Sequence, residues 1–237
     1  MKKPRKTYID YGFTGLSADQ QVVVLDIETT GLNIWDDEII GVKLLKCRLD
    51  APTEGLFQDN DTFDQRYYAD GPMSPEALAV HHIRLDSLKG APELSSAAQS
   101  IRAFIGPHPL ISHHVRFAQD FLSVAFERAG VDSLAANKGY CTLYRLREHT
   151  GLKHGEWFRR SLDDAATYLG IDTNGYNGDE RWAPLILKIR MAYFWWQYDE
   201  NGKNLFPPPI QKRQTPLSWK TMLFALALGL VVFLLFK

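Results

Sequence analysis

The pattern of apolar and polar positions predicts an α/β domain. Residues 21–27, QVVVLDI, form a continuous β-branched-rich run, which is typical of a central strand buried on both faces. Further runs predict three more strands, at 38–49, 62–69 and 110–112. Helical periodicity dominates the rest and predicts helices beginning at 74 and 91 and helices at 116–129, 140–149, 161–169 and 184–198. This order favours a mixed sheet flanked by helices.

The C-terminal end has a different pattern. Residues 221–236, TMLFALALGLVVFLLF, carry no charge and follow the proline-rich stretch 201–218. A sixteen-residue helix spans about 24 Å, and counting from Leu217 brings it close to the bilayer's hydrocarbon core of about 30 Å. The sequence therefore predicts a transmembrane anchor at 219–236, although a run this short also suits a buried core helix.

The distribution of charge along the chain predicts the roles of the folded domain, the linker and the N-terminal arm. Lys212, Arg213 and Lys220 precede the apolar run and only Lys237 follows it, so the positive-inside rule puts the folded domain in the cytoplasm. That domain is expected at 16–200, with 201–218 as a linker. Residues 1–15 form a basic arm that either contacts phosphates or lipid headgroups or is merely solvated.

Composition narrows the class of protein. Among 237 residues, 45% are hydrophobic and 23% charged, which excludes a mostly disordered chain, a fibrous repeat and a multi-span membrane protein. The net charge of −1 gives no global case for nucleic-acid binding. Two cysteines, Cys47 and Cys141, are too few for a disulfide scaffold and favour a reducing compartment.

Two carboxylates end the first apolar strand. Asp26 and Glu28 are two residues apart in VVVLDIETTGL, so in a strand both side chains project from one face. Like charges held this close need a counter-charge, and a divalent cation is the usual one. The turn Thr29-Thr30-Gly31 follows, and Gly31 gives the backbone freedom near a ligand.

These residues carry a family resemblance. LDIETTGL resembles the first motif of the DEDD superfamily of 3′–5′ exonucleases, the proofreading-exonuclease and ribonuclease T-like proteins. DEIIGVKLL, MSPEALAVHHI, LISHHVRFAQDFL, CTLYRLRE and SLDDAATYLGID resemble its later segments, so the likeness covers about residues 20 to 198. The resemblance implies a ribonuclease H-like fold, Mg²⁺ or Mn²⁺, phosphodiester hydrolysis and binding of single-stranded nucleic-acid ends.

The resemblance also assigns roles to residues. Asp26 and Glu28 match the first two metal-binding, catalytic acids of the family. The residues assigned to substrate binding belong to the first two motifs: Thr29, Thr30, Gly31, Leu32 and His113. Two further acids are weaker candidates, because the rest of the family's set does not carry over cleanly.

The second motif departs from the family pattern His-Asn-x-x-Phe-Asp. Here it reads HHVRFA, and Ala118 stands where the family has its metal-binding Asp. Asp120 lies two residues further on, but two helical residues turn a side chain by about 200°. Asp120 is therefore expected to point away from the metal site, and it is only a weak substitute ligand.

The third motif, His-x-Ala-x-x-Asp-Ala in the family, has two placements. In the first it falls near 180–187, where both the His and the Asp are missing, and 184–198 becomes the closing helix of the fold. In the second it is 159–165, with Asp164 as the ligand and Arg159 in place of the base. The first placement is preferred, because the second leaves the closing helix unexplained.

Three functions remain open at this point. One is a membrane-tethered exonuclease, one a degenerate member that binds nucleic acid without cleaving it, and one a non-catalytic membrane-tethered scaffold for a protein partner. Loss of two ligands and the base favours weak or absent cleavage. Arginines beside the motifs are candidate phosphate contacts or ordinary surface cations, and the aromatic residues of 193–198 either stack bases or pack into the core.

Overall fold

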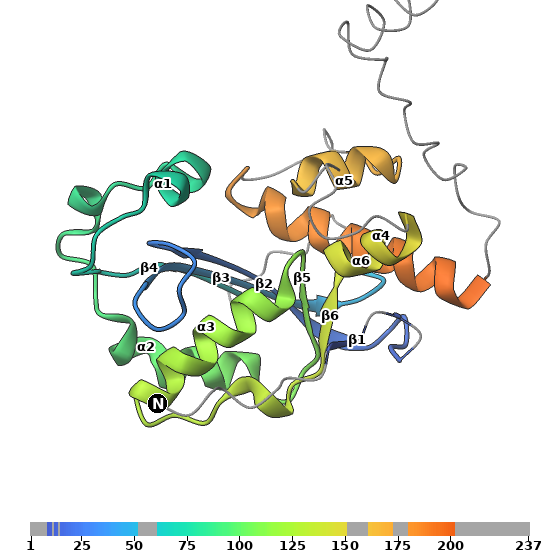
Figure 1. Ribbon diagram of the computed structural model, residues 1–237. Helices are drawn as coiled ribbons and strands as arrows, with labels where there is room; N and C mark the ends of the chain where they lie inside the picture. The colour runs from blue at the N-terminus through green and yellow to red at the C-terminus, as the bar shows by residue number, and fades with distance from the viewer. Residues whose placement is uncertain are drawn as a thin grey trace, which may run out of the picture. The chain divides into compact units, whose positions relative to one another are not determined.

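A six-stranded mixed sheet forms the middle layer of the structure (Figure 1). Its strands lie in the order β1 (Ile9–Asp10), β6 (Gly139–Cys141), β5 (Leu110–Ser112), β2 (Gln21–Thr29), β3 (Ile39–Arg48) and β4 (Thr62–Arg66). β1, β6, β5 and β2 run parallel to one another, whereas β3 and β4 pair antiparallel. β2 lies inside the sheet, between β5 and β3.

The computed structural model describes residues 9–10, 12–13, 15–51, 61–150, 161–172 and 180–201. The chain divides into two compact units, residues 1–206 and 207–237. The expected anchor and most of the linker lie outside the described residues, and the domain boundaries stay predictions. Within the described part, no helix combines the length and apolar character needed to cross a bilayer.

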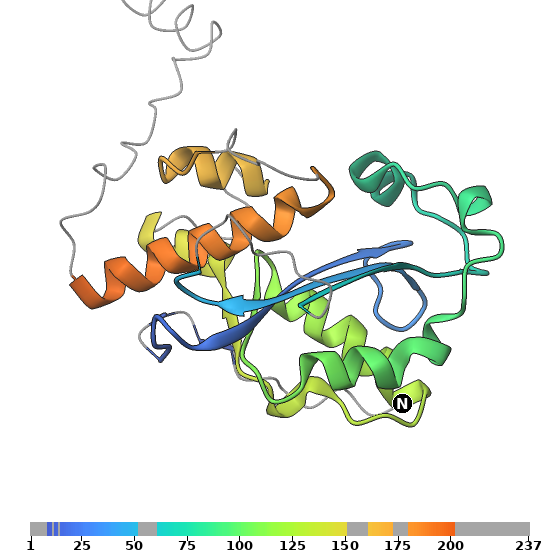
Figure 2. The same ribbon diagram turned by 180° about the vertical axis from the view of Figure 1, so that it is seen from behind.

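Helices cover both faces of the sheet (Figures 1 and 2). α2 (Leu94–Ile105) and α3 (Val115–Arg128) lie on one face, and α4 (Thr142–Thr150), α5 (Leu162–Tyr168) and α6 (Ala183–Asn201) lie on the other. The short α1 (Pro75–His81) stands beyond the sheet's β4 side, opposite α5 and α6, and buries none of its side chains.

Alternation along β2 divides the core in two. Val23, Leu25 and Ile27 pack with residues of α2 and α3. Val22 and Val24 pack on the other face with residues of α5 and α6. The strand therefore needs apolar side chains at successive positions, which explains the continuous run seen in the sequence. The mixed sheet flanked by helices agrees with the predicted α/β class.

The main differences from the expected elements concern short strands. β6 falls at Gly139–Cys141, just where a helix was expected to begin, because these residues pair with β5 and are buried. β1 was not expected, and the strand predicted at 62–69 ends at Arg66. The pairing partners of β1 and β6 are far away in the sequence, so no local pattern indicates them.

One carboxylate joins the end of α6 to two other parts of the domain. Asp199 accepts a hydrogen bond from the Phe13 backbone N–H at 2.8 Å, and it pairs with the Arg145 guanidinium of α4. Both charged side chains are nearly buried, with 9% and 11% of their surface exposed. Arg145 also lies over the Trp195 ring, 4.9 Å from its centroid.

We expect Asp199→Ala to lower the free energy of unfolding by about 3 kcal/mol, because it removes the buried partner of Arg145 and leaves only the 3.4 Å contact with the exposed Glu148. Urea unfolding of the purified protein measures this change. Glu200→Ala is the matched control: it removes an exposed carboxylate from the next residue, and we expect little effect. Equal losses in the two variants would contradict the structural role of Asp199.

Candidate active site

The site begins with the two carboxylates of β2. Asp26 and Glu28 follow Val22 and Val24 on the face of the sheet that α6 covers, and both are partly buried. Asp26 lies opposite Lys43 of β3, and Glu28 lies opposite Gly41. The strand's period of two thus brings the pair together, as the sequence predicts.

A cleft of about 880 Å³ opens at these carboxylates. The loop after β5 contributes to its wall, as do α1, α3, α5 and α6, and so it gathers segments far apart in the sequence. Its lining residues are Asp26, Ile27, Glu28, Val80, Ser112, His113, His114, Phe117, Ala118, Leu162, Asp163, Ala183, Pro184, Leu187 and Lys188.

Lys188 provides a cation inside this cleft. Its Nζ donates to Asp26 Oδ1 at 2.5 Å and to the Leu25 carbonyl oxygen at 3.1 Å. Only 4% of the Lys188 side chain is exposed, against 26% for Asp26. The sequence analysis missed this residue. The sequence does hold one indication of this residue, because Lys188 is the single charge within the apolar stretch PLILKI of the closing helix.

Glu28 lies between charges of both signs. Burial, followed by the neighbouring Asp26 charge, raises the pKa of Glu28 to about 7, and Arg66, Lys188 and Lys43 act in the opposite direction. Arg66 reaches this position across Gly41, where an added Cβ would lie 2.5 Å from its guanidinium nitrogen. Two carboxylates thus share their surroundings with three cations.

The residues that follow in the first motif shape a turn. The Thr29 hydroxyl donates to the Gly31 carbonyl oxygen at 2.6 Å, and the Thr30 hydroxyl donates to Asp37 at 3.1 Å. Both threonines are buried, so these hydroxyls hold the loop in shape. Leu32 is 81% exposed. Substrate contacts by these residues stay a prediction.

The second motif leads from β5 into α3. His113 is buried with its Nδ1 2.9 Å from the Thr142 hydroxyl, and its ring borders the cleft. Ala118 also lines the cleft, whereas Asp120 does not. Asp120 instead pairs with Arg116 at 3.5 Å, one turn earlier on α3. The Arg116 contact gives Asp120 a partner outside the cleft lining, and its weak assignment as a ligand stays a prediction.

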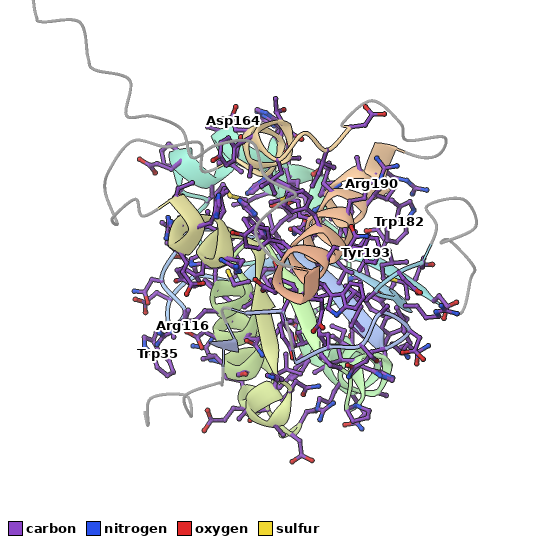
Figure 3. The ribbon with its side chains drawn as sticks, turned by 90° about the vertical axis from the view of Figure 1, so that its right-hand side faces the viewer. Trp35, Arg116, Asp164, Trp182, Arg190 and Tyr193 are labelled. Atoms are coloured by element: carbon purple, nitrogen blue, oxygen red, sulfur yellow. The ribbon has the colours of Figure 1, made fainter. Side chains whose placement is uncertain are left out.

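Segments of both placements of the third motif reach the cleft. Ala183, Pro184 and Leu187 of the first placement line it, and so does the neighbouring Lys188. Asp164 is absent from the lining, although the exposed Asp163 is part of it. Figure 3 shows Asp164 on α5 at the upper edge of the molecule. The choice between the two placements stays a prediction.

The other candidates lie mostly outside the cleft. Arg116 and Arg181 are exposed, whereas Arg159 and Arg160 lie outside the described residues. The aromatic cluster of α6 packs on or into the core, where Trp195 is fully buried. Core packing therefore accounts for most of this cluster without any contact to nucleic acid.

The donor set does not fit the two divalent ions that the resemblance implies. Among the described residues, no three His, Cys, Asp or Glu side chains come together in a metal-binding arrangement. At Asp26 the nearest cation is the Lys188 amino group, which belongs to the chain itself. Ala118, which also lines the cleft, offers no ligand atom. The geometry thus supplies an anionic pair that is already matched by cations.

Sequence comparisons relate this chain to exonucleases. A family model, RNase_T, described as Exonuclease, matches residues 23–176. The PolC-type DNA polymerase III of Halalkalibacterium halodurans is 30% identical over 113 residues, and that of Bacillus cereus is 28% identical over 117 residues. These alignments cover 48% and 49% of this chain but only 7% and 8% of the relatives.

Solved structures of exonuclease I share the fold. A product-bound exonuclease I matches with a TM-score of 0.57 and 14% identity, covering 74% of this chain and 43% of that one. E. coli exonuclease I in complex with a dT13 oligonucleotide matches with a TM-score of 0.55 and 13% identity, over 73% and 40% of the two chains. At this identity the likeness establishes the fold, with its mixed sheet and flanking helices.

The raised pKa of Glu28 predicts a pH-dependent stability. Between pH 4.5 and about 7 the folded domain keeps a proton on Glu28 that the unfolded chain releases, so this group makes the free energy of unfolding fall as the pH rises. We expect Glu28→Gln to remove that contribution. The variant should gain stability over the parent by on the order of 2 kcal/mol between pH 5 and pH 8.

Urea unfolding in EDTA at several pH values measures this difference. Glu76→Gln on α1 is the control, because Glu76 is exposed and we expect its substitution to leave the pH dependence unchanged. If Glu28→Gln follows the same curve as Glu76→Gln, the carboxyl of Glu28 has an ordinary pKa.

Proposed function

The chain belongs to the Exonuclease family, and on that premise we propose that its domain binds the end of a single-stranded nucleic acid while cleaving it weakly or not at all. The observation that carries this proposal is the cleft's composition. It combines the Asp26–Glu28 pair with Ala118, where the resemblance calls for a metal-binding Asp, and with the cation of Lys188. The cleft and its surroundings thus persist, whereas the ligands for hydrolysis do not.

The substrate class is inferred from the relatives and from the cleft's rim. The matching exonuclease I structures include complexes with dT13 and dA16 oligonucleotides. In this chain the exposed His114 ring stacks on Phe117, with centroids 5.8 Å apart and planes 8° from parallel. Val80 is 79% exposed and also borders the cleft. Such a rim suits the flat faces of unpaired bases, which stack on rings without regard to sequence.

Cations that act on Glu28 suit the phosphate backbone of the same ligand. Arg66, Lys43 and Lys188 all act on Glu28. A phosphate entering beside them meets positive charge that the two carboxylates do not fully cancel, since the raised pKa of Glu28 leaves it largely protonated below about pH 7. Electrostatic attraction of this kind weakens steeply with salt.

We expect the purified full chain in mild detergent to bind a single-stranded oligonucleotide in EDTA. His114→Ala should weaken binding by roughly tenfold through loss of stacking. The matched control is His108→Ala, since His108 precedes β5 at the end opposite His113 and is not among the residues lining the cleft. Fluorescence anisotropy measures both. Absence of binding would instead favour the scaffold that engages a protein partner.

We expect degradation of the same oligonucleotide in Mg²⁺ or Mn²⁺ to be at least about a hundredfold slower than by exonuclease I, because members of a catalytic set act as a unit. Gel assays of the products measure the rates. Rapid degradation that Asp26→Asn abolishes would refute the loss of activity.

Attachment to a membrane is a second part of the proposal and rests on sequence alone. The apolar run 221–236 lies outside the described residues, and its flanking charges place the domain on the cytoplasmic side. A membrane-held domain would meet nucleic acid or a protein partner near the bilayer. The proline-rich stretch 201–218 would then act as a semi-rigid spacer.

We expect the full chain to stay with membranes after a carbonate wash. Leu228→Arg combined with Leu230→Arg should release it, since each arginine costs roughly 2.5 to 3.5 kcal/mol near the centre of a membrane helix. Immunoblots of the pellet and the supernatant measure the distribution. Full-length protein found in the supernatant would show that the run is no anchor.

A further inference from the structure

The position of Lys188 carries an inference beyond the loss of ligands. α6 packs along β2 and β5, and Lys188 is the one charged residue within its stretch 183–189. Its neighbours Leu187 and Ile189 are 2% exposed, and Lys188 itself is 4% exposed in the same buried stretch. A lysine is almost never buried to this extent unless it is paired.

The Lys188 amino group pairs with two oxygen atoms of β2 in the cleft. Two of the amino group's hydrogen-bond directions are taken, by Asp26 Oδ1 at 2.5 Å and the Leu25 carbonyl oxygen at 3.1 Å. Both acceptors belong to β2, on either side of one peptide link. Oxygen ligands of this kind, a carboxylate and a backbone carbonyl, are also the ones that divalent cations use. The amino group thus holds the position that a cation would need at Asp26.

The positive charges around Glu28 also oppose the binding of a metal ion at Asp26. A site for two divalent ions needs a surplus of negative charge, but here Arg66, Lys43 and Lys188 act on Glu28 beside Asp26. A metal ion that binds Asp26 would have to displace the Lys188 amino group and break its hydrogen bonds to Asp26 Oδ1 and the Leu25 carbonyl oxygen. Repulsion and desolvation therefore both oppose its entry.

We infer that Lys188 is a resident cation that replaces a divalent metal ion at Asp26, so that the cleft binds the phosphate of its ligand without metal. The inference deepens the proposed function and rests on it for the ligand class, whereas the metal replacement stands on the contacts of Lys188 alone. One elementary charge, fixed by the chain, takes over the balancing of Asp26 that a metal otherwise provides.

The test removes the cation and asks whether a metal can take its place. Lys188→Met keeps the apolar stem and deletes the charge. In EDTA we expect its melting temperature to fall by several degrees and its oligonucleotide affinity to fall by roughly tenfold, since Asp26 is left without its partner. Millimolar MnCl₂ should then raise both, because an ion that binds only the folded state stabilises it.

The parent protein and two variants serve as controls under the same conditions. The parent should show neither a melting shift nor a change in affinity between EDTA and MnCl₂. Arg190→Met deletes a charge from the same helix, where Arg190 donates to the Asp172 carbonyl oxygen at the periphery (Figure 3), and should gain no Mn²⁺ response. Ala118→Asp should gain little, because Lys188 still holds Asp26, whereas Ala118→Asp with Lys188→Asp should gain the largest response.

Several outcomes would overturn the inference. One is a Mn²⁺-dependent melting shift in the parent that Asp26→Asn abolishes. Another is a folded Lys188→Met that gains no Mn²⁺ response. If Lys188→Met does not fold, the parent and Ala118→Asp still decide, because a strong Mn²⁺ response in either contradicts a cation fixed at Asp26. The melts need no nucleic acid, so a parent that binds no oligonucleotide refutes the proposed function without affecting this result.

Discussion

The two-residue period of β2 is the constraint on which the rest of the domain depends. It places Val22 and Val24 on the same face as Asp26 and Glu28, so whatever covers this face must meet an apolar half and an anionic half. α6 does both, since its buried aliphatic residues 185–189 are interrupted by one charged residue, Lys188. The helix that completes the core therefore also sets the electrostatic character of the cleft.

This division separates the residues that hold the fold from those that line the cleft. The two apolar clusters on either face of the sheet hold the layers together, and neither needs a metal ion. The ion pair with Lys188 gives the partly buried Asp26 carboxylate a partner from the chain itself. Fold and chemistry thus depend on different residues of the same strand and helix.

The sequence predicts those features that local periodicity controls. The apolar run at 21–27 indicates the central strand. The turn of the helix between Ala118 and Asp120 indicates that Ala118, and not Asp120, points into the cleft. The contact of Lys188 with Asp26 is different, because 162 residues separate the partners. β6 likewise depends on pairing with β5, about 29 residues away. Arg66 reaches Glu28 only because Gly41 leaves room between them. None of these contacts can be predicted from a periodic pattern in the sequence.

The attachment of Asp199 has a mechanical consequence. A pull on the chain where α6 ends at Asn201 is met first by Asp199, which is tied to the Phe13 backbone and to Arg145 of α4. These ties lie about 17 Å along the helix from Lys188, eleven residues upstream. Tension is therefore shared with the N-terminal segment and with α4 before it reaches the cleft. Load applied at that end of the domain therefore reaches the contacts of Asp199 before it reaches the Lys188–Asp26 pair.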